Sequence, residues 1–177
     1  MSQQHIDLWM QTADAFDQRY QALGDAHWAA SSPCEGWTVK DVVDHAVGTQ
    51  AGFAGPLVGA SISEGAEWPA VRSAITESLQ AEGALDGMTE GGPMGPMPKT
   101  MMFGIAVADL LMHTWDVARG AGLDESLPEA PVQASYMGLQ KMPSDMMRAE
   151  GRFGPEVACA DDADTQTKLL CYAGRQV

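Results

Sequence analysis

TMMFGIAVADLLMHTWDVARGAG, residues 100–122, is the stretch that decides the fold of this chain. It contains no proline, and Gly120 and Gly122 at its end are stop signals for a helix. We therefore predict a helix from about Thr100 to Arg119. About 20 helical residues span roughly 30 Å, enough to cross the core of a small domain.

Further helices are predicted on both sides of this stretch. Apolar residues recur at three- and four-residue spacing over 6–23, which indicates an amphipathic helix that ends at Gly24. Thr38 resembles an N-cap, with Asp41 three residues later, and begins a helix with an apolar stripe through Val47. Two more helices are expected at about 69–82 and 130–141, and a final helical turn at 165–173, after an acidic turn.

The middle of the chain is predicted to be irregular. Gly52, Gly55, Pro56 and Gly59 weaken a helix, so 55–68 is expected to be a loop. The segment GGPMGPMP, residues 91–98, excludes helix and central strand and is expected to form one lip of a site. The pattern predicts one all-α domain over residues 1–177, a four-helix bundle with a long middle connection.

Composition excludes several classes of partner. The net charge is −14, from 10 Lys and Arg against 24 Asp and Glu, and no basic cluster offsets it. Nucleic acids and anionic membrane surfaces would be repelled, so neither is expected as a partner. The three cysteines contain no C-x-x-C pair, the start does not resemble a signal peptide, and no stretch approaches the roughly 18 apolar residues of a membrane helix. We expect a cytoplasmic protein.

Four polar residues suggest a metal site. Asp109, His113 and Asp116 lie within about 60° of one another on a helix, flanked by apolar rather than charged residues. His45, on another predicted helix, could supply a second imidazole. Three protein ligands leave a coordination position open, as in catalytic zinc sites. The alternative is a helix-surface Asp-x-x-x-His pair that arises by chance.

The remaining candidates have simpler interpretations. His5 and His27 are expected to be incidental, the second in a loop beside Trp28. Cys34 is interpreted as a small buried side chain, with a thiol near the site as the alternative. Trp37 and Trp115 are expected in the core or in a pocket wall. The motifs of P-loop, Rossmann, nucleophile-elbow and H-E-x-x-H proteins are absent.

Three segments resemble one known family. SPCEGWTVKDVVDHAVG, ADLLMHTWDVARGAG and the tail FGPEVACADDADTQTKLLCYAGR are similar to the DinB-like superfamily, in the branch with the metal-binding domain of mycothiol-dependent maleylpyruvate isomerase. The tail is similar to one actinobacterial subgroup. In the first segment the matching positions are Pro33, Cys34, Gly36, Trp37, Thr38, Val39 and His45.

The resemblance implies a DinB-like bundle that binds a divalent ion, most often zinc, through two histidines and one carboxylate. It assigns His45, Asp109 and His113 as ligands, with Asp116 supporting His113 from behind. Two departures matter. Many members have Glu where this chain has Asp109, and this chain ends without the additional C-terminal domain of the full isomerase. Maleylpyruvate isomerisation itself is therefore not expected.

Two function classes follow from this resemblance. In the first, the protein is a zinc enzyme that activates mycothiol, a small-molecule thiol, and transfers its sulfur to a small electrophile. In the second, it binds a metal or small ligand and has no chemistry of its own. A homodimer is left open. The open site and the 91–98 lip favour the first class.

Overall fold

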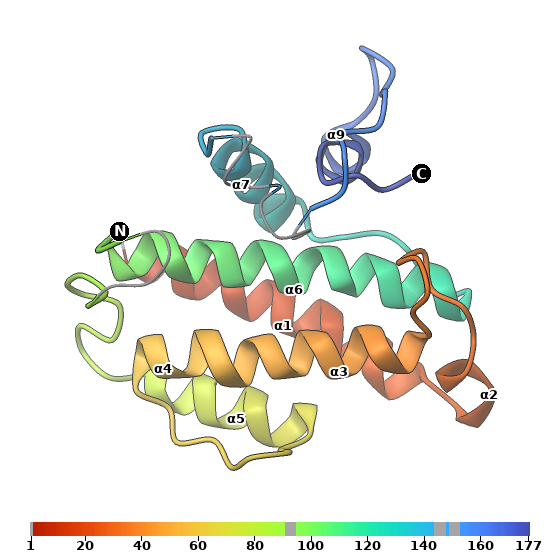
Figure 1. Ribbon diagram of the computed structural model, residues 1–177. Coiled ribbons are helices and arrows are strands. Elements are labelled where there is room, and N and C mark those ends of the chain that lie inside the picture. Colours follow the sequence, from red (N-terminus) through yellow and green to blue (C-terminus); the bar gives the residue numbers. More distant parts are fainter. Residues whose placement is uncertain (1, 91–94, 144–147, 149–152) are drawn as a thin grey trace.

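The computed structural model describes residues 2–90, 95–143, 148 and 153–177, and these residues are mostly helical (Figure 1). In chain order the elements are α1 (Ser2–Ala22), α2 (Asp25–Trp28), α3 (Val39–Thr49), the π-helix η1 (Gln50–Ala54), α4 (Gly55–Val58), α5 (Trp68–Leu79), α6 (Lys99–Ala121), α7 (Glu129–Leu139) and α9 (Thr165–Tyr172). The described part of the chain has two isolated β-bridges, Ser31–Thr38 and Met88–Pro98, and no strand. The all-α prediction is confirmed.

Helix α6 is the centre of the structure. It packs on α1 and α3 on one side and on α7 on the other (Figure 1). It ends at Gly122, whose φ of +66° is the left-handed conformation that glycine adopts most readily at a helix C-terminus. Gly120, predicted as a stop, lies inside the helix. A Cβ there would lie 2.8 Å from Val39 Cγ2, so this glycine allows α6 to approach the start of α3 closely.

The predicted start of α3 is confirmed. The Thr38 hydroxyl accepts a hydrogen bond from Asp41 N, and the Asp41 carboxylate accepts one from Thr38 N, which together form a capping box. The start of the predicted loop at 55–68 is wrong, because α3 continues through η1 and α4 to Val58. Pro56, the second residue of α4, directly follows the π-helical turn.

The bundle consists of α1, α3, α5 and α6, with a long connection between α5 and α6. Its core contains three fully buried tryptophan or phenylalanine side chains from α1 and α5, namely Trp9, Phe16 and Trp68. Gln50 is buried beside them, accepts a hydrogen bond from Trp9 Nε1 at 3.0 Å and donates one to Ala106 O at 3.0 Å. These bonds tie α1, η1 and α6 together.

Helices α7 and α9 cover the face of α6 that points away from α3 and α5 (Figure 1). Leu111 of α6 packs there with Val132, Leu139 and Leu169. Asp164 caps α9 by accepting a hydrogen bond from Thr167 N at 2.7 Å, so the predicted acidic turn and final helix are confirmed. The tail therefore returns to α6.

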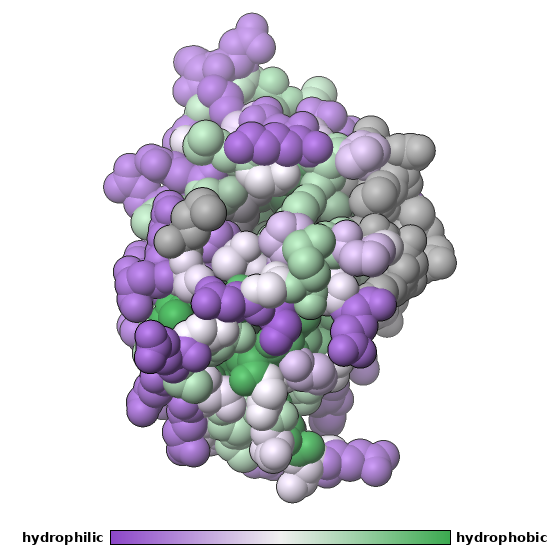
Figure 2. All heavy atoms as spheres, turned by 90° about the vertical axis from the view of Figure 1, so that its left-hand side faces the viewer, coloured by the Kyte–Doolittle hydropathy of each residue, from purple (hydrophilic) through white to green (hydrophobic). Residues whose placement is uncertain are grey.

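Helix α6 is also the one described helix whose length and hydropathy would suit a membrane span, with a mean hydropathy of 1.2. The expectation that no stretch approaches this composition is wrong. However, 72% of the 18-residue part of α6 that has this hydropathy is buried inside the protein, as expected for the central helix of a bundle. The end of the bundle shown in Figure 2 carries a mixture of hydrophilic, intermediate and moderately hydrophobic residues, and strongly hydrophobic ones show through only in small areas.

Candidate metal centre

The structure brings His45, Asp109 and His113 together. Asp109 and His113 lie one turn apart on α6, and His45 faces them from α3. His113 Nε2 is 3.6 Å from Asp109 Oδ1, and His45 Nε2 is 3.9 Å from the same oxygen. One ligand atom from each residue lies within 4.8 Å of the others. The three residues that the sequence suggested are therefore neighbours.

The spacing and polarity of this cluster suit a small cation. A tetrahedral zinc ion with ligand bonds of 2.0–2.1 Å places its ligand atoms about 3.3 Å apart, so only small side-chain shifts are needed. Asp109 Oδ2 is buried and has no hydrogen-bond partner among the described residues. A buried carboxylate oxygen without a partner is costly, and a bound cation would remove that cost.

The cluster also attracts positive charge without a metal. The interaction between His45 and the Asp109 carboxylate raises the pKa of His45, although partial burial of His45 opposes this. The His45 side chain is 42% exposed and that of His113 only 9%. The cluster therefore opens to solvent on the His45 side, where a further ligand could reach a bound ion.

Asp116 lies behind His113 on α6. His113 Nδ1 lies 2.9 Å from Asp116 Oδ2, which leaves Nε2 directed toward Asp109. A carboxylate behind a ligating imidazole fixes its tautomer and makes it a better ligand. This arrangement is what a metal-binding histidine requires.

Arg175, which the sequence did not suggest, holds Asp116 in turn. Its Nη2 donates to Asp116 Oδ2 at 2.8 Å and its Nε to Asp116 Oδ1 at 3.3 Å. Burial disfavours the charged form of Asp116, but His113 and Arg175 more than compensate and lower its pKa to about 2. The stabilisation from this ionised group is thus present above its ordinary pKa of 3.8 and is lost as the pH falls through 2.

Cys34 lies beside this network, which favours the alternative of a thiol near the site. Its Sγ is 3.4 Å from Asp116 Oδ2. Burial and the negative charge of Asp116 raise the thiol pKa to about 11, although Arg175 partly opposes this. Cys34, His113 and Asp116 form a second group close enough to hold a metal ion. Both Asp116 oxygens already accept hydrogen bonds there, so His45, Asp109 and His113 are the better site.

Two tryptophans take different places. Trp37 is 37% exposed and packs edge-on against the His45 ring, with ring centroids 5.1 Å apart, so it forms a wall of the site. Trp115 is fully buried in the core, and Arg119 covers its ring.

His27, predicted in a loop, lies in the short helix α2, where its Nδ1 accepts a hydrogen bond from Gly24 N.

Two cavities lie near α6 and α3. One of about 460 Å³ lies between α1, α6 and α7, and its lining includes Ile105 and Ala108, close to Asp109 along α6. Pro98 and His5 also line this cavity. Pro98 is about 16 Å along the helix axis from Asp109. The described part of the 91–98 segment therefore borders this cavity and not the metal cluster, and 91–94 lie outside the described residues.

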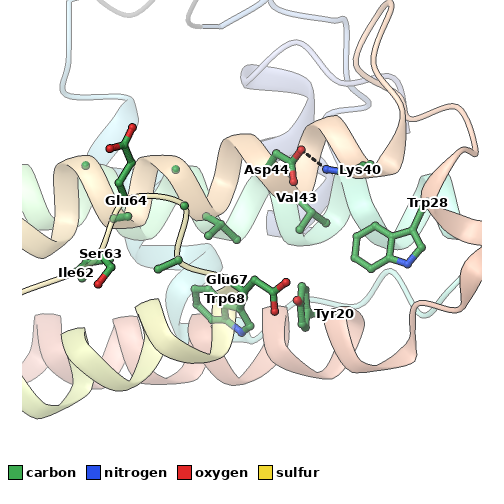
Figure 3. Close-up of a pocket in the computed structure, with 16 residues that line it drawn as sticks. Tyr20, Trp28, Lys40, Val43, Asp44, Ile62, Ser63, Glu64, Glu67 and Trp68 are labelled. Carbon is green, nitrogen blue, oxygen red and sulfur yellow. Dashed lines mark hydrogen bonds and ion pairs between the residues drawn. The ribbon is translucent and has the colours of Figure 1, made fainter.

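The larger cavity, of about 900 Å³, is a groove between α3, the 62–67 segment and the ends of α1 and α2 (Figure 3). Its wall includes Tyr20, Trp28, Val43, Glu67 and Trp68. His45 and the two ligand candidates on α6 do not line it. The groove is thus separate from the candidate metal centre.

A comparison with known protein families finds one match, within the first half of the chain. Residues 9–88 match the mycothiol maleylpyruvate isomerase N-terminal domain. This match confirms the resemblance expected from the sequence motifs. The matched residues include His45 but end before Asp109 and His113, so the carboxylate and the second histidine depend on the structure for support.

Two similar proteins come from Mycobacterium tuberculosis: "Uncharacterized protein MT0763" of strain CDC 1551 / Oshkosh and "Uncharacterized protein Rv0738" of strain ATCC 25618 / H37Rv. Each is 28% identical over 154 residues, which cover 82% of this chain and 84% of the relative. Similarity thus extends beyond the N-terminal segment. No solved structure matches significantly.

Substitutions at Asp109 test whether metal binding depends on the length or on the charge of the acidic ligand. We expect Asp109→Glu to bind a metal ion with an affinity within about 10-fold of the parent, because it keeps a charged oxygen ligand in a partly open site. Asp109→Asn, of nearly equal size but neutral, should lose more affinity. Isothermal titration with zinc measures both. Tight binding by the Asn variant, with loss in the Glu variant, would contradict this assignment.

Proposed function

We propose that this protein binds one divalent ion, zinc, through His45, Asp109 and His113, and that it is a mycothiol-dependent transferase acting on a small electrophile. The observation that carries the proposal is the cluster itself. Two imidazoles and a carboxylate meet within 4.8 Å, and one buried carboxylate oxygen has no partner among the described residues.

Zinc, when bound, supplies a Lewis-acid position that binds a thiolate and lowers the pKa of the thiol. The protein residues position the ligands and form the entrance to the site. His113 is held in place by Asp116 and Arg175, while His45 and Trp37 form the exposed side by which a thiol would enter. The family match to a mycothiol-related domain supports mycothiol as that thiol.

The apolar cavity beside Ile105 and Ala108 supports a place for the electrophile. It lies on the part of α6 just before Asp109, although none of the three ligand candidates lines it, and its volume of about 460 Å³ suits a small molecule. The net charge of −14 supports the further proposal of a cytoplasmic protein without nucleic-acid or membrane partners.

The thiol-binding step is tested by spectroscopy on cobalt-substituted protein. Adding mycothiol should produce a new sulfur-to-metal absorption band that saturates at one thiol per chain. His27→Ala, which leaves all three ligand candidates in place, should behave like the parent, and His113→Ala should give no band. In a coupled assay, conjugation of a chlorinated aromatic electrophile should stop when a chelator is added.

If the metal-loaded protein shows no new band, the transferase proposal is wrong. A non-catalytic protein that binds a metal ion or a small ligand then becomes the better description. The band without conjugation would refute the chosen electrophile and leave thiol binding supported.

A further inference from the structure

The groove between α3 and the 62–67 segment is lined by aromatic rings as well as by polar groups (Figure 3). Tyr20 and Trp28 form an aromatic wall, with ring centroids 6.1 Å apart and an angle of 76° between the ring planes, so the two rings make a corner. Val43 and the fully buried Trp68 form an apolar floor. The volume of about 900 Å³ is large enough for a small organic molecule.

The charged side chains around this groove are mostly acidic. Asp44, Glu64 and Glu67 line it, and Lys40 is the one cationic side chain among the described residues of its lining. Lys40 already pairs with Asp44, at 2.5 Å, in an ion pair on the protein surface. The groove therefore keeps an excess of negative charge.

The neighbouring Arg72 does not cancel this charge. It does not line the groove, and its guanidinium pairs with Asp14 and Asp17 of α1. The same Asp17 carboxylate accepts a hydrogen bond from Trp68 Nε1 at 3.0 Å, which fixes the indole at the floor of the groove.

The Glu67 carboxylate forms no hydrogen bond or ion pair with the described residues. Glu67 is the N-cap of α5, but its side chain makes no capping hydrogen bond. It points toward Tyr20 instead (Figure 3). Burial raises the pKa of Tyr20 and the negative charge of Glu67 raises it further, which agrees with this placement. The carboxylate is thus available to a cation in the groove.

We propose that this groove binds a protonated primary amine with an apolar or aromatic body. The ammonium group would lie against the rings of Tyr20 and Trp28, since the faces of aromatic rings attract cations. It would donate hydrogen bonds to Glu67 and to Asp44, while Val43 and Trp68 contact the body. A carboxylate or phosphate ligand would be repelled by the same acidic groups. The inference rests on the groove alone and not on the proposed metal or thiol chemistry.

The binding test follows glycine amide signals by NMR in isotope-labelled full-length protein, with a chelator present. Three glycines line the groove, Gly48, Gly52 and Gly65, whereas Gly104 and Gly138 line the cavity between α1, α6 and α7. Phenethylammonium should shift the three groove signals saturably, with a Kd on the order of 1 mM for so small a probe, and leave the other two in place. Phenylethanol and phenylpropanoate, with a similar body but a neutral or negative end, should not saturate the groove signals.

Substitutions in the groove should change this affinity in opposite directions. Glu67→Gln should weaken binding by about 3- to 5-fold through loss of an exposed ion pair, and Lys40→Met should strengthen it by about 2-fold by removing a competing ammonium group. Trp28→Leu should weaken binding by about 3-fold or more through loss of an aromatic face. Glu129→Gln on α7 makes the same change in net charge outside the groove and should bind like the parent. The same spectra show whether each variant is folded.

Three results would overturn the proposal: no saturable shift of the groove glycines, equally tight binding of phenylethanol, or a Glu67→Gln variant that binds no more weakly than Glu129→Gln. The third result would mean that the net charge of −14 attracts the amine without a specific site. Weaker binding by Lys40→Met would also contradict it. Because the chelator keeps metal out, failure here leaves the proposed metal site untouched, and failure of the metal site leaves this inference untouched.

Discussion

His113→Ala is expected to reduce zinc affinity by more than about 100-fold. Removing a hydrogen-bond partner behind a metal ligand lowers metal affinity by about 10–100-fold, and removing the ligand itself must lower it further. His113 is the residue on which the site depends most. It is nearly buried, and the described contacts hold one of its nitrogens toward Asp116 and the other toward Asp109. No other described imidazole could replace it, since His45 already belongs to the cluster and His5 and His27 do not.

Metal content after dialysis measures this effect. The parent should retain about one zinc per chain, His113→Ala and His45→Ala should retain none, and the control His5→Ala should match the parent. If His45→Ala kept full metal content after dialysis, the ligand set would be wrong.

Asp116→Ala is expected to lower the free energy of unfolding by about 3 kcal/mol or more, because it leaves the Arg175 guanidinium, 13% exposed, without its partner. Asp116→Asn keeps the size of the side chain but not its charge. It should weaken zinc binding about 10-fold or more by loosening His113. Urea denaturation and zinc titration measure the two effects separately.

The double variant Asp116→Ala/Arg175→Met distinguishes a charge effect from lost packing. If the isolated guanidinium causes the instability, removing it should restore part of the lost stability. The double variant should then be more stable than Asp116→Ala alone. Strictly additive losses from the two substitutions would contradict this explanation.

Local sequence signals predicted the elements that carry the candidate site. The helix containing Asp109 and His113 and the cap at Thr38 depend on neighbouring residues, and both were confirmed. The proximity of His45 to Asp109 was suggested by residue types and by the family resemblance, and the packing of α3 on α6 agrees with it.

Other features depend on tertiary contacts that local patterns do not reveal. Arg175 is 59 residues from Asp116 in sequence, and nothing in the tail marks it as a partner of a buried carboxylate. Gly120 looked like a helix stop but serves a close helix contact. Glycines and a proline predicted a loop at 55–58, whereas the π-helical turn at Gln50–Ala54 lets the helix continue.

X-ray absorption spectroscopy of the zinc-loaded protein without added thiol tests the central claim most directly, because it distinguishes the two groups that could hold the ion. Zn–N and Zn–O distances are about 2.0–2.1 Å and Zn–S distances about 2.3 Å. Coordination by His45, Asp109 and His113 predicts a nitrogen and oxygen shell with the multiple scattering of two imidazoles and no sulfur. A sulfur ligand with a single imidazole would instead place the ion at Cys34, His113 and Asp116 and contradict the proposed site.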